Sequence, residues 1–372
     1  MAALAAASAP ASRRRVLVTG GLGYIGSHTV VELMSAGHPV TIVDNLSNSH
    51  RGALARIRSM VTRPDELACV ELDIRDRAAL ERLFADTAAR GDAFGGCIHF
   101  AAFKAVGESR QKPLMYFDNN VTGSVVLLET LAKHGVKQFV FSSSCTVYGA
   151  AASPVSEDSS TGVGITNAYA QTKYTVETML RHLQAADPSW RIAVLRYFNP
   201  VGAHASGLIG EDPCGIPNCL MPYALQVLVG RREKLTVFGN DYPTRDGTCI
   251  RDYIHVVDVA RGHIDALRWL EGLPANEGTI DYFNFGTGRG TTVLELVAAL
   301  EKASGKTLNK VMGARREGDL AEMWCVPEKA KRVLGWEAKY GIDTISEDAW
   351  RFQSQNPQGY ANDGDGGGGA GK

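Results

Sequence analysis

Two residues that could take a proton from an alcohol stand four positions apart, near the start of an expected helix. The spacing of Tyr169 and Lys173 puts both side chains on one helical face. Because an ammonium group beside a phenol favours the phenolate, the pair predicts a tyrosine whose pKa falls below its ordinary value of about 10. Ser144, upstream at the end of an expected strand, could hydrogen-bond the same substrate oxygen. The three side chains therefore indicate a site for general acid–base chemistry on an alcohol.

A second candidate site is a glycine-rich turn between the first expected strand and helix. Gly20, Gly23 and Gly26 form G-x-x-G-x-x-G, which allows a tight turn, close approach of a pyrophosphate to the helix N-terminus and close helix–strand packing. Asp44 follows the second strand, where a carboxylate can accept both hydroxyls of an adenosine ribose. This pattern predicts a dinucleotide site and favours NAD over NADP. The alternative, that Asp44 only caps its own turn, stays open.

The elements that must position these residues alternate along the first half of the chain. Short apolar runs rich in β-branched residues alternate with amphipathic stretches up to about Asn199, which predicts a doubly wound parallel α/β sheet of the Rossmann type. The strands' carboxyl ends would then meet at one crevice. We expect an NAD-binding domain over 15–199 and a smaller mixed α/β substrate lobe over 200–358. A strand-like segment near 281–290 is a candidate to return to the first domain.

Composition restricts the class of protein. The 372 residues include 39 basic and 40 acidic ones, giving a net charge of −1 without long blocks of one sign, which argues against a nucleic-acid polymer as partner. Seven scattered cysteines without Cys-x-x-Cys spacing favour free thiols in a reducing, cytoplasmic compartment and no metal site. No apolar run approaches the roughly 20 residues of a membrane-spanning helix. Residues 1–14 and 361–372 are expected to be disordered, with an organelle transit peptide as the alternative for the first.

The glycine turn, the strand-end hydroxyls and the Y-x-x-x-K pair together resemble the extended short-chain dehydrogenase/reductase superfamily. Longer strings are similar to the UDP-galactose (UDP-glucose) 4-epimerases, and they recur in order over roughly residues 15–360. These strings lie at 44–49, 104–109, 196–204, 215–218, 237–242, 251–256 and 315–319.

The resemblance implies a reaction. UDP-glucose and UDP-galactose would be interconverted at C4 through a transient 4-keto sugar, with bound NAD reduced and reoxidised in each turnover. Tyr169 would act first as base and then as acid, with Lys173 beside it and Ser144 positioning the sugar O4. The family often forms homodimers, so a homodimer is also implied.

The resemblance further implies two sets of binding residues. The expected cofactor-binding residues are Gly20, Gly23, Tyr24, Ile25, Gly26, Asp44, Asn45, Asn48, Ser49, Asp73, Ile74, Phe100, Ala101, Ala102, Lys104, Asn119, Ser142, Tyr169, Lys173, Tyr197 and Phe198. The expected substrate-binding residues are Lys104, Ser144, Tyr169, Asn199, Asn218, Leu220, Val237, Phe238, Arg251, Arg316, Asp319 and Met323.

Two positions depart from the family pattern. Cys219 stands where bacterial members carry a second asparagine, so a contact through that side chain is lost or moved to its neighbours. Met323 occupies a position that faces the substituent at C2 of the sugar and varies in size among members. Because methionine is flexible and intermediate in size, acceptance of N-acetylated sugars stays open.

Other functions remain as alternatives. A UDP-pentose or UDP-N-acetylhexosamine 4-epimerase would share the mechanism. A sugar-nucleotide dehydratase needs an Asp-Glu pair after the strand-end threonine, whereas Val147 and Tyr148 follow Thr146 here. A non-catalytic NAD-binding regulator would be expected to lose Tyr169 or Lys173, and this chain keeps both.

Overall fold

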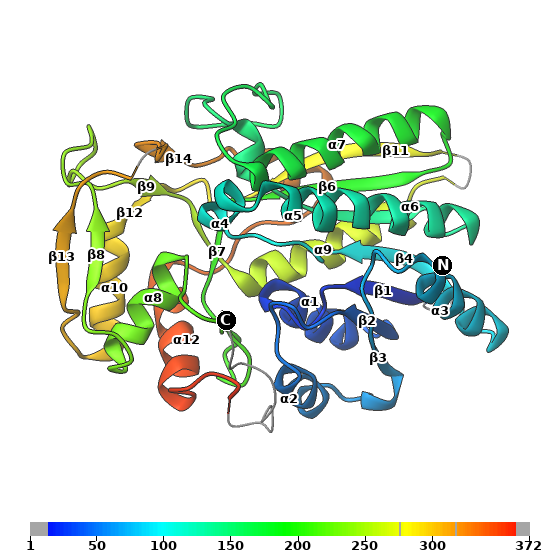
Figure 1. The fold of residues 1–372 in the computed structure, drawn as a ribbon, viewed down its shortest axis with the longest axis horizontal. Coiled ribbons are helices and arrows are strands. Elements are labelled where there is room, and N and C mark those ends of the chain that lie inside the picture. The colour runs from blue at the N-terminus through cyan, green and yellow to red at the C-terminus, as the bar shows by residue number, and fades with distance from the viewer. Residues whose placement is uncertain (1–13, 275–276, 317, 362–372) are drawn as a thin grey trace, which may run out of the picture.

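A sheet of seven parallel strands forms the centre of the molecule (Figure 1). The computed structural model describes residues 14–274, 277–316 and 318–361, so the expected disordered ends lie outside it apart from Arg14 and Ala361. The strand order β11-β6-β5-β4-β1-β2-β3 confirms the doubly wound parallel sheet. The strands are β1 (Arg15–Thr19), β2 (Val40–Asp44), β3 (Leu67–Glu71), β4 (Phe94–His99), β5 (Gln138–Ser144), β6 (Arg191–Tyr197) and β11 (Thr279–Phe285).

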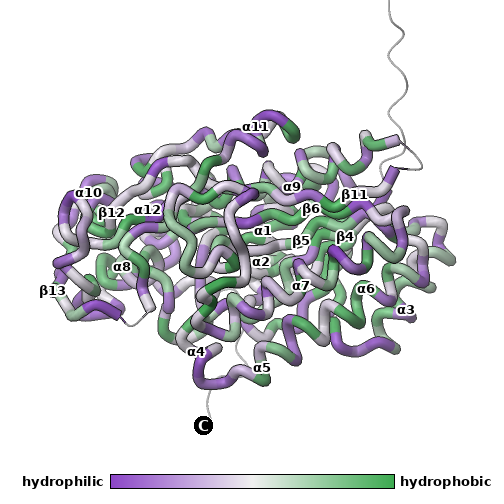
Figure 2. Tube along the Cα trace, turned by 90° about the horizontal axis from the view of Figure 1, so that it is seen from above, coloured by the Kyte–Doolittle hydropathy of each residue, from purple (hydrophilic) through white to green (hydrophobic). Residues whose placement is uncertain are grey.

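Alternating side chains along these strands fill two separate cores. Val16 and Val18 point to one face of the sheet and Leu17 to the other, as the two-residue period of a strand requires. Figure 2 shows this apolar interior as green strands, with more hydrophilic trace on outer helices such as α3 (Arg77–Ala89). The first face is covered by α1 (Tyr24–Ser35), α2 (Gly52–Met60) and α9 (Val256–Glu271), and the second by α3, α6 (Gly123–Lys133) and α7 (Ala168–Ala186).

Two elements of the main sheet layer come from the second half of the chain. Strand β11 pairs in parallel with β6 over its whole length, so residues 279–285 form the seventh strand. Helix α9 packs against α1 on the same face of the sheet and contributes Val259 and Leu267 to the core there. The sheet layer therefore extends beyond the expected boundary at 199/200, because the apolar face between α1 and β6 needs a helix that the first half does not supply.

The second lobe has its own core between short strands and helices, at the left of Figure 1. Val237 and Leu296 are two of its fully buried side chains. Its strands are β7 (Asn199–Val201), β8 (Leu235–Phe238), β9 (Ile250–Arg251), β10 (Tyr253–His255), β12 (Thr291–Thr292), β13 (Lys310–Gly313) and β14 (Glu322–Met323). Its helices are α8 (Leu220–Leu228), α10 (Val293–Ser304) and α12 (Ile342–Gln355).

The remaining helices are short. They are α4 (Val106–Gln111), α5 (Pro113–Phe117), α11 (Glu328–Leu334) and the 3₁₀ turns Pro64–Glu66 and Cys145–Tyr148. A π-helical turn over Asp118–Thr122 joins α5 to α6, and turns of this kind occur frequently at functional sites. Among the described residues, no helix has the length and apolar character needed to cross a membrane.

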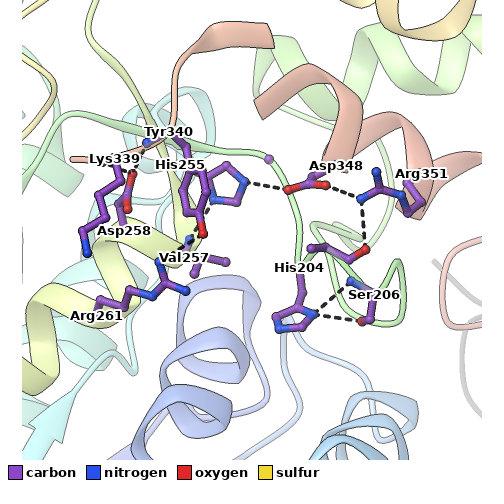
Figure 3. Close-up of polar contacts among 12 residues, drawn as sticks. His204, Ser206, His255, Val257, Asp258, Arg261, Lys339, Tyr340, Asp348 and Arg351 are labelled. Carbon is purple, nitrogen blue, oxygen red and sulfur yellow. Dashed lines mark hydrogen bonds and ion pairs between the residues drawn. The ribbon is translucent and has the colours of Figure 1, made fainter. Parts of the chain in front are cut away.

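A buried polar cluster joins α9 to α12 (Figure 3). His255 caps α9 by accepting a hydrogen bond from the Val257 amide, and its Nε2 lies 3.2 Å from Oδ2 of Asp348. Arg351 also pairs with Asp348 and donates to the Ala205 carbonyl at 2.9 Å. The cluster therefore holds the loop after β7 against the last helix.

Candidate active site

The glycine turn between β1 and α1 leaves no room for side chains. Gly20 has φ +71°, and a Cβ there would lie 2.7 Å from the Ala101 amide nitrogen. A Cβ on Gly26 would lie 2.2 Å from the Gly20 carbonyl oxygen. The turn therefore brings backbone rather than side chains to the N-terminus of α1, which starts at Tyr24. This geometry fits a dinucleotide pyrophosphate.

Asp44 ends β2 beside this turn, with its carboxylate partly engaged. It accepts hydrogen bonds from the amides of Leu22 and Leu46, both at 3.0 Å, and from the Ser49 hydroxyl at 2.7 Å. A carboxylate has about four acceptor sites. The turn-capping role left open by the sequence is therefore present, and one acceptor site remains for a ribose hydroxyl.

Residues after β3 form the next part of the same edge. Asp73 accepts from the Asn45 amide at 3.0 Å and forms an ion pair with Arg75, and hydrogen bonds from Arg75 lower the pKa of this carboxyl. Ile74 is buried in the core beneath α6, whereas Asn48 is exposed. Sequence reasoning missed Arg75, which also pairs with Asp118 in the π-helical turn.

The end of β4 is fixed against β1. The amides of Phe100 and Ala101 both donate to the Thr19 carbonyl, at 3.0 and 3.1 Å. Next to them His99 lies with Nδ1 2.6 Å from the Thr19 hydroxyl and Nε2 2.9 Å from that of Ser124. Burial lowers the pKa of His99 to about 3, so this ring is a neutral bridge. Ala102 and Ile25 are partly exposed at the same edge.

The expected catalytic side chains meet at the carboxyl end of β5. Ser144 is the last residue of β5 and Tyr169 the second of α7, whose N-cap Asn167 accepts from the Ala170 amide at 2.9 Å. Tyr169 faces Ser144, whose hydroxyl acts to lower the pKa of the phenol and accepts a hydrogen bond from Thr146 at 3.0 Å. The structure therefore brings together a phenol and a strand-end hydroxyl from segments 25 positions apart.

The pKa expected for Tyr169 needs correction. Burial raises the pKa of this phenol to about 12, while the neighbouring Ser144 hydroxyl and the charge of Lys104 act in the opposite direction. Lys173 instead turns inward and donates from Nζ to the Ser142 carbonyl at 2.5 Å. Burial lowers the pKa of Lys173 to about 7. The i,i+4 spacing is thus as expected, but desolvation dominates the pKa of Tyr169, and Lys173 is not among the main groups that shift it.

Lys104 and Asn119 have partners that the sequence did not indicate. The Lys104 Nζ donates to Glu211 Oε1 at 2.8 Å and lies 5.7 Å from the centre of the Tyr24 ring. Asn119 is buried in the π-helical turn and donates to the Asn120 side chain at 2.9 Å. Glu211 lies between the strings at 196–204 and 215–218 and belongs to neither, so its role was not visible in the sequence.

Tyr197 and Phe198 at the end of β6 are core side chains. The Tyr197 hydroxyl is hydrogen-bonded to His263 of α9, and Phe198 is 5% exposed. The Phe198 amide donates to the Phe285 carbonyl at 3.2 Å. Both residues therefore turn their side chains into the protein, and a cofactor contact from Tyr197 would have to come from its backbone.

The arginines expected to bind the diphosphate lie in the second lobe. Arg316 donates to a neighbouring carboxylate and Arg251 to backbone carbonyls. Arg316 donates from Nε to Asp319 at 2.8 Å and lies over the Phe238 ring. Arg251 donates from Nη1 to the carbonyls of Ile250 and Leu320, at 2.8 and 2.9 Å. Because Arg316 is exposed and Arg251 partly so, their other guanidinium nitrogens can face an anion. Val237 is buried in the core of this lobe.

The remaining substrate positions lie between the lobes. Asn199 begins β7, where its amide donates to the Asp252 carbonyl at 3.0 Å. Asn218 and Cys219 are exposed just ahead of Leu220 and helix α8. Met323 is 6% exposed and packs in a small apolar cluster with Cys145, Val147, Tyr148, Val155, Phe198 and Cys325.

Comparison with known proteins identifies the family. A model of the NAD dependent epimerase/dehydratase family matches residues 16–282. The chain is 52% identical to UDP-glucose 4-epimerase of Bacillus subtilis over 346 residues, 93% of this chain and 98% of the relative. It is 52% identical to the Homo sapiens enzyme of that name over 353 residues, again 93% and 98%.

The solved structures agree. A crystal structure of UDP-glucose 4-epimerase from Bifidobacterium longum in complex with NAD+ and UDP has a TM-score of 0.87 and 45% identity, covering 93% of this chain and 99% of that one. The chain therefore belongs to the NAD dependent epimerase/dehydratase family, and within it to the UDP-glucose 4-epimerase group.

Proposed function

We propose that this chain interconverts UDP-glucose and UDP-galactose by epimerisation at C4, with NAD as its bound cofactor. The observation that carries the proposal is the meeting of Tyr169 with the Ser144 hydroxyl at the strand edge that also holds the glycine turn. The high identity to UDP-glucose 4-epimerases over nearly the whole chain supports this choice of substrate.

Tyr169 is the proton carrier in this proposal. NAD, when bound, supplies the hydride acceptor and donor and brings a positive charge. Tyr169 takes the proton from the sugar O4 as C4 is oxidised to a ketone and gives it back to O4 when C4 is reduced from its other face, while Ser144 orients O4. Because the pKa of Tyr169 is about 12 without ligands, the phenolate needs nearby cations, and Lys104 is one of those that lower it. Lys173 supports the end of β5 through the Ser142 carbonyl.

The second lobe would hold the nucleotide. The exposed guanidinium of Arg316 and the partly exposed one of Arg251 suit a diphosphate, and Asp319, which pairs with Arg316, would accept from the uridine ribose. Asn199 and Asn218 can donate to the nucleotide sugar. Asp44 and the glycine turn would hold the NAD ribose and pyrophosphate. Substrate and cofactor would then approach Tyr169 from opposite lobes.

Met323 bears on the choice among UDP-sugars. Its packing against Phe198 and Val155 fixes it in a buried cluster close to Ser144, so it does not swing freely. We expect N-acetylated substrates to react more slowly than UDP-galactose. Assays with UDP-N-acetylgalactosamine and UDP-pentoses in parallel measure this preference.

Compartment and assembly are part of the proposal. The seven cysteines, all within the described residues, are free thiols, which suits the cytoplasm. A homodimer would need an exposed face on each copy, and a shallow, mostly apolar groove on α7 lined by Tyr174, Thr178 and Met179 is such a face. Sedimentation of the purified protein and of a Thr178→Arg variant tests this assembly.

The activity has a direct test. Purified protein is mixed with UDP-galactose without added cofactor, and UDP-glucose is assayed with a coupled dehydrogenase. We expect product from the unsubstituted chain and a loss of at least about a hundredfold in kcat for Tyr169→Phe, because the general acid–base group is gone. Equal activity in Tyr169→Phe, or no product even with added NAD, would contradict the proposal.

A further inference from the structure

The ion pair between Lys104 and Glu211 joins the cofactor edge of the sheet to the chain that follows β7. Lys104 follows β4 at the cofactor edge, and Glu211 lies on a loop of the second half of the chain, 107 positions later. The Glu211 side chain is 10% exposed, whereas that of Lys104 is 50% exposed. The carboxylate is thus the fixed partner and the ammonium the mobile one.

The surroundings of Lys104 give this pair a chemical consequence. The Lys104 charge lowers the pKa of Tyr169, and its Nζ lies over the ring of Tyr24 at the start of α1. A lysine has four rotatable side-chain bonds, so an ammonium with half its surface in solvent does not keep one position without a partner. Glu211 supplies that partner.

The loop that carries Glu211 is itself held firmly. We call residues 202–212 the bridging loop. Its backbone carbonyls accept hydrogen bonds from α1, α2 and the last helix, and its Gly210 amide donates to the Tyr360 hydroxyl at 3.1 Å. The carbonyl contacts are Tyr24 to Gly202 at 2.7 Å, Arg351 to Ala205 at 2.9 Å, Asn356 to Gly207 at 2.9 Å and Arg56 to Leu208 at 2.8 Å.

Residues on either side of Glu211 are fixed as well. Asp212 accepts from the Tyr360 amide at 2.8 Å, and a Cβ on Gly210 would lie 2.3 Å from the Phe352 ring. The Glu211 backbone therefore has little freedom. Figure 3 shows the part of this support that runs from Asp348 and Arg351 to the loop.

We infer that Glu211 is a positioning residue for the epimerase reaction, which holds the Lys104 ammonium where it can stabilise the Tyr169 phenolate and the bound cofactor. The inference rests on the role given to Lys104 in the proposed function. The alternative is that the Lys104–Glu211 ion pair only stabilises the fold and that Glu211 does not act through Lys104. The positioning role and this alternative make different predictions.

A double-mutant cycle separates them. Full-length Glu211→Gln, Lys104→Met and the double variant are assayed for kcat and for KM with UDP-galactose. We expect Glu211→Gln to lower kcat about tenfold while KM changes less than about threefold, since the reacting group and not nucleotide binding is affected. In the Lys104→Met background the same substitution has no further effect. Glu129→Gln, which removes the carboxylate of an exposed ion pair with Arg77, is the matched control and keeps full activity.

Two results would overturn the inference. One is an equal loss of kcat from Glu211→Gln in both backgrounds, which would mean that Glu211 acts on the fold independently of Lys104. The other is full activity in Glu211→Gln. If Lys104→Met keeps full kcat, the role of Lys104 falls together with this inference, whereas the Tyr169→Phe assay still decides the proposed function.

Discussion

At the scale of single residues, burial rather than helical spacing sets the chemistry of Tyr169 and Lys173. Both side chains are largely removed from water, which favours the neutral form of each. The free chain therefore keeps its base protonated and its lysine near the point of losing its proton. Proton transfer at such a site depends on charges that arrive with its ligands. Burial of these ionisable groups also costs stability, and that cost can be measured.

The first prediction concerns that cost at Lys173. Its pKa is about 7 in the folded chain against an ordinary value near 10.5, so between these values the unfolded chain binds more protons and stability rises with pH. We expect Lys173→Met to raise the melting temperature at pH 7 by about 2 °C or more while abolishing activity. The gain should shrink by pH 10, where the amine is neutral in the folded chain.

Calorimetric melting of both proteins at pH 7 and pH 10 checks this expectation. Tyr169→Phe is the control, because its phenol is neutral in both states at pH 7 and the variant should show no such pH-dependent gain. A lower melting temperature for Lys173→Met at pH 7 would show that its hydrogen bond to the Ser142 carbonyl outweighs the desolvation of its charge.

At the scale of elements, turns and loops at the strand ends determine the site. The β1–α1 turn is defined by short backbone approaches that exclude any Cβ, and the bridging loop by contacts with three helices. The β1–α1 turn depends on residues that are adjacent in the chain, so it can be recognised in the sequence. The bridging loop depends on contacts between segments that are far apart in the chain.

The second prediction tests the turn. In Gly26→Ala the new methyl would lie 2.2 Å from the Gly20 carbonyl, so the turn must open and its amides can no longer converge on a pyrophosphate. We expect the purified variant to lose most of its bound NAD, measured by release on denaturation. Gly107→Ala in α4, where a Cβ meets open space, should retain NAD. Normal NAD content in Gly26→Ala would refute this account of the turn.

The third prediction tests the support of the bridging loop. Asp348 is 6% exposed and faces His255 and Arg351, so Asp348→Ala leaves the buried His255 without its acceptor and removes the ion pair with Arg351. We expect a loss of about 3 kcal/mol in the free energy of unfolding, measured in urea. Asp343→Ala in the same helix removes an exposed pair with Lys302 and should cost less than about 1 kcal/mol. Similar losses in both variants would argue against a special role for the cluster.

At the scale of the whole molecule, the two lobes share one continuous chain that crosses between them several times. Helix α9 and strand β11 return to the sheet layer after the second lobe has begun, so neither lobe is a contiguous segment. Several neutral histidines are buried where these segments pack, and they link the stability of the assembled molecule to pH.

The fourth prediction follows from His28, His99 and His263. Burial lowers the pKa of each to about 3, against about 6.5 in the unfolded chain. Between these values the unfolded chain binds more protons, so stability is lost as pH falls below 6.5, by up to about 1.4 kcal/mol per pH unit for each ring. His50, whose pKa is raised to about 9, is charged in both states below 6.5 and adds nothing to this slope.

Urea unfolding at pH 7.5, 6 and 5 measures the effect, because most carboxylates stay ionised over this range. We expect the free energy of unfolding to fall steeply below pH 6.5, and His28→Leu to reduce that slope by about a third. A free energy that stays level between pH 6.5 and pH 5 would contradict the buried neutral histidines.

The sequence by itself determined what depends on neighbours along the chain. The glycine turn, the first six strands and the one-face spacing of Tyr169 and Lys173 were predicted because turn sterics and the periods of strand and helix are local properties. The family followed from ordered strings of residues. The sequence could not give the partners of Lys104 and Asp73, because Glu211 and Arg75 carry no motif.

Only the tertiary structure decided the electrostatics of Tyr169 and Lys173. Their pKa values depend on burial, and burial is a sum over segments that meet in space, including Ser144 and Lys104. The same reason places α9 in the sheet layer, since only the assembled sheet shows which face lacks a cover, whereas the return of the segment near 281–290, now β11, was already a candidate in the sequence. Tyr169 and Lys173 were therefore identified by their spacing, while their protonation states are set by the fold around them.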